Sequence, residues 1–166
     1  LQVCGVNANK DGTTGYSWAA ARSSPVIWSG GCNSTNTSGS WVTYCLNATD
    51  FNSAGDYLDV NSNGTITVKQ AGYYQAEFYT TQYGCGEQNI NLLVNGAGRA
   101  YSYDVNETTT QVHSTHHASL KWPFKKGDTF VAQTYHNGCG SQQNYIAWNA
   151  NGAYSRLTLE YLGPLN

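Results

Sequence analysis

Charged side chains are scarce in this sequence, and their scarcity excludes one class of partner. Lysine, arginine, aspartate and glutamate together make up 11% of the chain, and the formal net charge is −2. A chain with so few cations has no basic surface that could neutralise phosphates or follow an anionic membrane. Nucleic acid is therefore not an expected partner.

Long apolar runs and helical patterns are also missing. No run approaches the roughly 20 apolar residues with which a helix crosses a bilayer, so membrane insertion is not expected. No long stretch keeps apolar residues at helical spacing, whereas β-branched and aromatic residues alternate between clusters of Gly, Asn, Ser and Thr. The chain is predicted to be all-β.

The sequence carries none of the common catalytic signatures. It has no Gly-x-Ser-x-Gly segment that would present a serine nucleophile, no histidine pair on a predicted helix, and no cysteine spacing typical of a zinc site. We expect a binding protein and not an enzyme, without a cofactor.

Five cysteines and no methionine are what the chain has instead. Thiols at this number, without metal-binding spacing, are typical of proteins that mature in an oxidising compartment. We therefore expect a secreted or cell-surface protein. Its 166 residues are enough for one domain with a continuous core.

The expected strands are alternating or β-branched runs bounded by turn residues. They are residues 26–28, 41–46, 65–69, 73–81, 89–94, 99–103, 116–124, 129–135 and 154–162. Asn95-Gly96 is a strong hairpin signal and predicts that the strands on either side of it pair. Lys126-Gly127-Asp128 predicts a second hairpin in the same way.

Four segments occur in a characteristic order, and they are QAGYYQAEF, NLLVNG, SLKWPFKKGDTFVAQ and YSRLTLEYL. This ordered set resembles the tumour-necrosis-factor-like superfamily, in particular the globular heads typified by complement component q. The resemblance implies a two-sheet antiparallel jelly-roll sandwich that forms a homotrimer. It assigns residues 41–166 to the head and residues 1–40 to an N-terminal extension with the first strand region.

Two similar segments, 83–88 and 137–142, fall in loops at the distal apex on that topology. Their shared Gly-Cys-Gly-x-Gln pattern predicts a disulfide between Cys85 and Cys139, because flanking glycines let two loops approach closely. Cys32 and Cys45 would then form a second disulfide. Cys4 would then have no partner within its own chain near the stalk end, and it would be either free or a link between chains of the trimer.

The residues around the expected apical disulfide combine aromatic rings, amides and a carboxylate, a mixture that suits a sugar. The candidate ligand-binding residues are Tyr83, Glu87, Gln88, Tyr135, His136, Asn137, Gln142, Gln143, Asn144, Tyr145, Trp148 and Asn149. Trp148 is the foremost of them. The alternative is that Trp148 and Tyr145 pack beneath the loops and the amides merely face solvent.

A second candidate surface follows from alternation on the last strand and its expected neighbours. The candidate trimer-interface residues are Glu77, Tyr79, His117, Arg156 and Glu160. If this face meets neighbouring subunits, Arg156 paired with Glu77 or Glu160 would set the register of the trimer.

A calcium loop is a weaker hypothesis. Asp59, Asn61 and Asn63 place oxygens at alternate positions before Gly64, as in the opening of such a loop. The twelfth position is Gln70 where a bidentate glutamate belongs, so a plain hairpin turn is favoured.

Three functional hypotheses follow. The first is a trimeric adhesin or fibre-tip head that recognises a glycan, or a glycosylated surface receptor, through its distal loops. The second is a head that binds a protein receptor in grooves between subunits. The third is a structural cap that trimerises a fibre and has no ligand.

Overall fold

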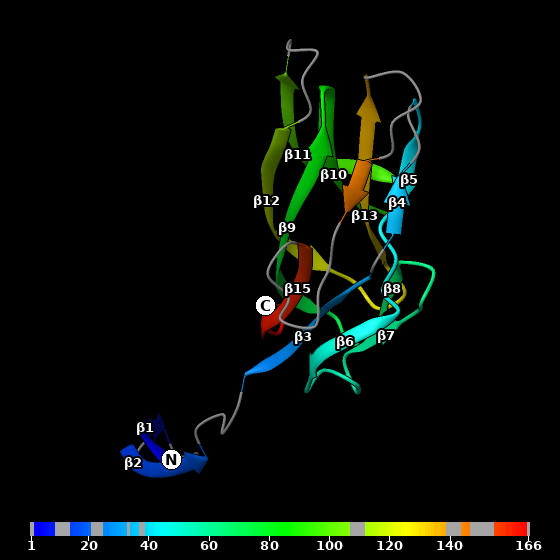
Figure 1. Ribbon diagram of the computed structural model, residues 1–166. Coiled ribbons are helices and arrows are strands. Elements are labelled where there is room, and N and C mark those ends of the chain that lie inside the picture. The colour runs from blue at the N-terminus through cyan, green and yellow to red at the C-terminus, as the bar shows by residue number, and fades with distance from the viewer. Residues whose placement is uncertain are drawn as a thin grey trace.

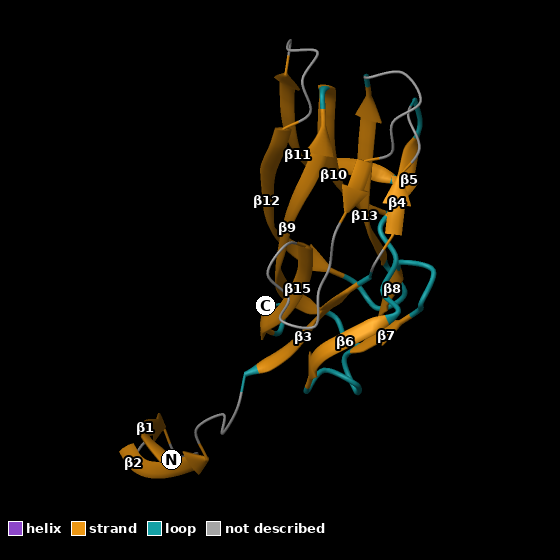
Figure 2. Cartoon of the chain, in the orientation of Figure 1, coloured by secondary structure: helices purple, strands orange, loops and turns teal. Residues whose placement is uncertain are grey.

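The computed structural model describes residues 2–8, 14–20, 25–32, 34–36, 39–106, 112–138, 144–146 and 155–165, in which every regular element is a β-strand (Figure 2). The strands are β1 (Gln2–Ala8), β2 (Thr14–Ala20), β3 (Val26–Gly31), β4 (Ser34–Asn36), β5 (Trp41–Thr43), β6 (Ala48–Asn52), β7 (Leu58–Val60), β8 (Thr65–Val68), β9 (Gly72–Gly84), β10 (Gly86–Val94), β11 (Ala97–Asn106), β12 (Val112–Phe124), β13 (Thr129–Asn137), β14 (Asn144–Ile146) and β15 (Ser155–Gly163). Within these residues the structure contains no helix with the length and hydropathy to span a membrane.

Two antiparallel sheets form the body of the fold (Figure 1). One has six strands, in the order β11-β10-β13-β8-β7 with β5 also paired to β13, and the other has five, in the order β12-β9-β15-β3-β6. Strands β1 and β2 pair with each other, as do β4 and β14. The predicted two-sheet antiparallel sandwich is confirmed.

The core lies between the two sheets and is built by strict alternation along the strands. On β9, Tyr74, Ala76 and Phe78 are fully buried, as their shared parity predicts. The other large side chains that are fully buried come from strands of both sheets and, for Tyr44, from the segment that follows β5. They are Trp28, Tyr44, Ile66, Ile90, Leu92, Phe124, Phe130, Leu157 and Leu159. Burial of this apolar surface is the main driving force of the fold.

The hairpin predicted at Asn95-Gly96 is confirmed. Strands β10 and β11 pair on either side of it, and both turn residues have positive φ, 51° for Asn95 and 76° for Gly96. A two-residue turn with positive φ at both positions matches the right-handed twist of the paired strands, which is why Asn and Gly occupy it.

The second predicted hairpin is wrong, although both of its strands exist. Strand β12 pairs with β9 in the five-stranded sheet, whereas β13 pairs with β10, β8 and β5 in the other. The turn at Lys125–Asp128 is tied to the end of β8, because Gly127 N donates to Val68 O at 2.8 Å and Val68 N donates to Asp128 O at 2.9 Å. The turn therefore carries the chain from one sheet to the other.

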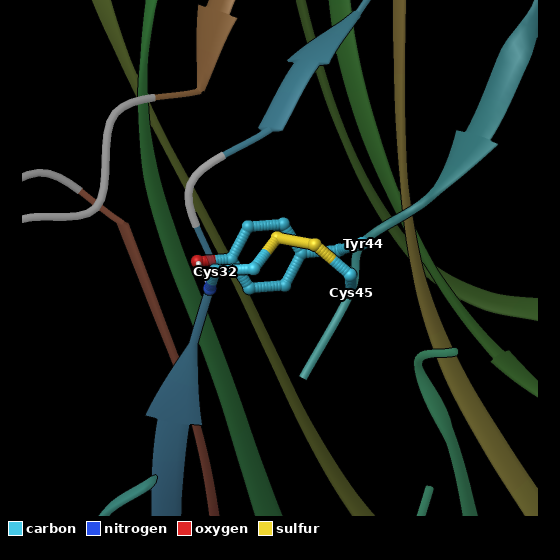
Figure 3. The surroundings of a disulfide bond; sticks show 3 residues. All are labelled: Cys32, Tyr44 and Cys45. Atoms are coloured by element: carbon cyan, nitrogen blue, oxygen red, sulfur yellow. Dashed lines mark hydrogen bonds between the residues drawn. A yellow bond between two sulfur atoms is a disulfide. The ribbon is translucent and has the colours of Figure 1, made fainter. Parts of the chain in front are cut away.

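A disulfide between Cys32 and Cys45 joins the end of β3 to the segment that follows β5, as expected from the sequence (Figure 3). Tyr44 lies beside it, and its hydroxyl accepts a hydrogen bond from Cys32 N at 3.4 Å. Burial raises the pKa of Tyr44 to about 12, so the hydroxyl stays neutral. Its ring packs on Phe78 with a centroid separation of 4.8 Å, which connects the disulfide to the core.

Candidate functional site

The apical end of the sandwich is the end at which β9 passes into β10 and β13 finishes (Figure 1). The segment 83–88, expected to be a loop, is instead almost entirely strand, since β9 runs to Gly84 and β10 starts at Gly86. The chain changes sheets at Cys85 alone. This leaves the apical end with a short, well-defined connection on the β9–β10 side.

Two glycines let this connection touch the end of β13. A Cβ on Gly86 would lie 2.3 Å from Asn137 O, and one on Gly138 would lie 2.5 Å from Cys85 O. Only glycine fits at both positions, so the flanking glycines serve the close approach expected of them. Cys85 is disulfide-bonded, and its predicted partner Cys139 lies outside the described residues.

Three of the candidate ligand-binding residues lie on the outer face of the six-stranded sheet near the apex. Glu87 and Asn137 are directly opposite each other on β10 and β13, and Tyr135 follows two positions away on the same face. Asn137 is exposed, while Glu87 and Tyr135 are partly buried. One oxygen of Glu87, Oε1, accepts a hydrogen bond from Asn89 Nδ2 at 2.7 Å. This hydrogen bond holds the carboxylate in place.

Gln88 and His136, also expected to contact a ligand, point into the interior of the sandwich. They are opposite each other in register and share the parity of Ile90 and Ala132, and both are buried. A ligand on the described surface cannot reach these two side chains. The sequence carried two opposing signals, because the parity of these positions indicated the interior whereas polar residue types are uncommon on the inward face of a strand.

Gln88 and His136 belong to a polar layer inside the apical half of the sandwich. Its buried members are Thr80, Gln82, Gln88, His116, Thr134, His136 and Ser155. Thr80 and Ser155 share a hydrogen bond of 2.8 Å between their hydroxyls, and His116 Nε2 lies 3.5 Å from Gln88 Oε1. Neither ring nitrogen of His136 makes a hydrogen bond of good geometry with the described residues, although the Gly138 backbone is near enough to affect the ring. The apical interior therefore contains buried polar groups whose hydrogen bonding is incomplete, unlike the aromatic core below it.

Burial lowers the pKa of both histidines in this layer. For His116 the charge of Asp104 offsets part of the effect, and for His136 the Gly138 backbone does so. The folded protein therefore binds these protons less readily than the unfolded chain, whose histidines titrate near pH 6.5. The neutral histidines therefore make their full contribution to the free energy of unfolding above about pH 6.5. That contribution is lost as the pH falls through the pKa values of the folded protein.

Acid should therefore weaken the fold through His116. We expect the urea midpoint of the wild type to fall between about pH 7.5 and about pH 5.5, and to fall less in His116→Gln. His117→Gln is the matched control, because its side chain is exposed one position along the same strand. A fall of equal size in wild type and both variants would show that buried His116 does not carry the effect.

For the remaining ligand-binding candidates the structure describes either the backbone alone or nothing. Tyr83 lies on β9, and Asn144 and Tyr145 lie on β14, and for these three only the backbone is described. Trp148, Gln142, Gln143 and Asn149 lie outside the described residues. Their roles stay predictions.

The candidate trimer-interface residues come together on the outer face of the five-stranded sheet. Thr158 lies opposite Glu77, and Tyr79 lies opposite both Arg156 and His117. The rings of Tyr79 and His117 are 6.4 Å apart. Within the chain Arg156 Nε pairs with Asp50 Oδ2 at 3.2 Å, and not with Glu77 or Glu160. Pairing of Arg156 with a neighbouring subunit stays a prediction.

The residues considered for calcium form a hairpin turn between β7 and β8. Asn61 Oδ1 accepts from Asn63 N at 3.1 Å, and Asn63 Oδ1 accepts from Thr65 N at 2.9 Å. Both amide oxygens thus stabilise the backbone of the turn. Asp59 lies on β7 opposite Thr67. In the described part of the chain the structure has no cluster of three His, Cys, Asp or Glu residues able to hold a metal ion.

Three exposed aromatic residues beside Tyr135 were not singled out from the sequence. Trp41 of β5 lies opposite Tyr135, and Tyr101 and Tyr103 of β11 lie two strands away on the same outer face. The alternation of Tyr101 and Tyr103 was a usable signal, because residues two apart share a face. The position of Trp41 had no such signal, since it depends on the pairing of β5 with β13.

Two solved structures superpose on most of the chain. The globular domain of zebrafish complement 1qA protein matches with a TM-score of 0.59 over 86% of this chain and 100% of that chain, at 14% identity. Eiger TNF from S. frugiperda matches with a TM-score of 0.59 over 86% of this chain and 95% of that chain, at 11% identity. No protein-family model and no curated protein matches the sequence. At these identities the shared property is the fold, which is the jelly roll of a complement-q-like and TNF-like globular head.

Proposed function

We propose that this chain is the trimeric binding head of a surface or secreted fibre and that it recognises a glycan through its apical end. The observation that carries the proposal is the contact between the β9–β10 connection and the end of β13 at Gly86 and Gly138. This contact holds an acidic, an amide and a phenolic side chain, those of Glu87, Asn137 and Tyr135, on a rigid frame. Rigid loops lose less conformational entropy when they bind.

Trimerisation would multiply a shallow site. Three weak sites on one head, engaged together, give an avidity well above the affinity of any one of them. The outer face of the five-stranded sheet suits a subunit interface, because exposed Tyr79 lies among His117, Arg156 and Glu77. Aromatic and arginine side chains are enriched in such interfaces.

An extracellular location agrees with the cysteine chemistry. The disulfide between Cys32 and Cys45 and the disulfide-bonded state of Cys85 both require an oxidising environment to form and persist. A head outside the cell is where a glycan or a glycosylated receptor can be met. The proposal is one of binding and involves no catalysis.

The test combines the molar mass of the non-reduced protein, by light scattering, with a glycan array on the same sample. We expect a mass near three chains and a reproducible sugar signal that is lost in Trp148→Ala. Phe51→Ala is the control, because Phe51 is an exposed aromatic residue on β6, in the other sheet. A monomer would contradict the trimeric head. A trimer without any sugar signal would instead favour a protein receptor or a structural cap.

A further inference from the structure

Four aromatic side chains form a continuous row on the outer face of the six-stranded sheet. This aromatic row consists of Tyr135, Trp41, Tyr101 and Tyr103. Successive ring centroids are 5.3 Å apart for Tyr135 and Trp41, 6.1 Å for Trp41 and Tyr101, and 6.3 Å for Tyr101 and Tyr103. These separations are those of rings in contact.

The row faces solvent. Trp41 is 40% exposed, Tyr101 is 53% exposed and Tyr103 is 57% exposed. Each lies on the side of the sheet opposite the core, because their register partners Asn91, Asn89 and Tyr135 have the opposite parity to the inward residues Ile90 and Ala132. A connected group of exposed rings of this kind on one sheet face is typical of a binding surface.

Amides lie among the rings. On β10, which lies between β11 and β13, Asn89 is flanked by Tyr103 on one side and Tyr135 on the other, and Asn91 is flanked by Tyr101 and Gln133. The rings therefore offer apolar faces, and the amides between them offer hydrogen-bond donors and acceptors.

Asn89 is the most informative of these amides. It is 1% exposed, its Nδ2 donates to Glu87 Oε1, and its Oδ1 has no partner among the described residues. A buried acceptor without a partner costs free energy that a ligand hydroxyl could recover. Tyr103 and Tyr135 stand on either side of Asn89 in the register, so a hydroxyl that bonds to this oxygen would enter between them.

The charge of the surface around the aromatic row limits the class of ligand that it can bind. No lysine or arginine stands at the outward positions of β10 (residues 87, 89, 91 and 93) or of β13 (residues 131, 133, 135 and 137), and Glu87 is the acidic side chain among them. Burial, followed by the charge of Glu87, raises the pKa of Tyr101, so its hydroxyl remains a neutral donor. Arg99, two positions from Tyr101 on β11, has its guanidinium 4.7 Å from the centre of the Trp122 ring on β12, in the other sheet. An anionic ligand would therefore meet Glu87 without a compensating cation on β10 or β13.

We propose that the aromatic row is a second binding site, on the flank of the head, that takes a neutral saccharide. The apolar face of a pyranose would lie on Trp41 and Tyr101, and its hydroxyls would bond to Glu87, Asn91 and Gln133. The choice of ligand class rests in part on the proposed glycan-binding function, whereas the site itself rests on the row and its amides.

The test measures binding of short neutral oligosaccharides of glucose, galactose, mannose and N-acetylhexosamines by isothermal titration calorimetry. We expect Trp41→Ala and Tyr101→Ala each to weaken binding by roughly tenfold or more, with the melting temperature close to that of the wild type. Tyr101→Phe keeps the ring and should lose less. Phe51→Ala is the matched control for loss of an exposed aromatic ring and should bind as the wild type does.

Other outcomes would overturn the inference in distinguishable ways. Binding that is lost in Trp148→Ala but kept in Trp41→Ala would leave the proposed apical function standing and remove the flank site. A polyproline peptide that binds through Trp41, with no saccharide binding, would show that the row takes an extended peptide. If no neutral saccharide binds the trimer at all, the flank assignment is wrong, whereas the apical function stands or falls by the glycan array.

Discussion

Replacing Phe78 by alanine is expected to lower the free energy of unfolding by about 3–5 kcal/mol. Phe78 is completely buried on β9 and its ring packs against Tyr44, which lies next to the Cys32–Cys45 disulfide. Alanine would remove the apolar contacts and leave a cavity that the two sheets cannot close, because both are fixed by their hydrogen bonds. Since a domain is stable by only about 5–15 kcal/mol, the loss is a large share of the total.

Urea or thermal unfolding at fixed protein concentration would measure the loss in free energy of unfolding that Phe78→Ala causes. The fall in melting temperature should be on the order of 10 °C for a chain of this size. Phe51→Ala is the control, because Phe51 is 51% exposed on the edge strand β6 and its loss should change stability by no more than about 0.5 kcal/mol. Equal losses in the two variants would mean that Phe78 does not lie in the core.

Removing the disulfide by Cys32→Ala together with Cys45→Ala should cost about 3 kcal/mol. The two cysteines are separated by 13 positions, and a loop of that length loses roughly this much chain entropy when it is closed in the unfolded state. Alanine is the better replacement, because Cys32 is fully buried and serine would bury an extra hydroxyl there.

The dependence of unfolding on urea concentration shows whether the disulfide acts through the unfolded chain. An effect on the unfolded chain should raise the m-value as well as lower the midpoint, because the unlinked chain exposes more surface. Ser40→Ala, an exposed position within the same closed loop, should leave both quantities unchanged. A double variant with the midpoint of the wild type would show that the disulfide does not stabilise the fold.

Local patterns in the sequence predicted those features that depend on neighbouring residues. The alternation of Tyr74, Ala76 and Phe78 identified a core face, and Asn95-Gly96 identified a hairpin, because each signal is complete within a few residues. The ordered set of motifs also indicated the jelly-roll fold that the superpositions show.

Features that depend on which sheet a strand joins were not predictable in the same way. The turn at Lys125–Asp128 has the composition of a hairpin turn, yet its hydrogen bonds to Val68 send β13 into the opposite sheet. The aromatic row likewise joins Trp41 to Tyr135 across a pairing of distant strands. No local pattern encodes such a register, so the sequence placed the ligand site at the apical end only.

Gln88 and His136 show a third kind of limit. Their residue types indicated surface, but their parity with Ile90 and Ala132 indicated interior, and parity decided. The apolar residues fix which face of a strand points into the core. Every second side chain then points inward as well, whether it is polar or apolar.

The central position of β15 in the five-stranded sheet has a consequence during translation. β15 lies between β9 and β3, and 129 positions separate Ser29 from Thr158, which bond across this seam. At about 5–20 residues per second, a ribosome needs about 6–26 s to make the stretch between them. Throughout that interval β3 of the nascent chain lacks β15 beside it, and β9 lacks β15 from the time that residues 72–84 have been made. Unpaired strand edges attract other chains. Ribosome-bound copies are therefore the form of this protein most exposed to aggregation, and slowing translation should lower its yield more than that of a helical domain of equal length.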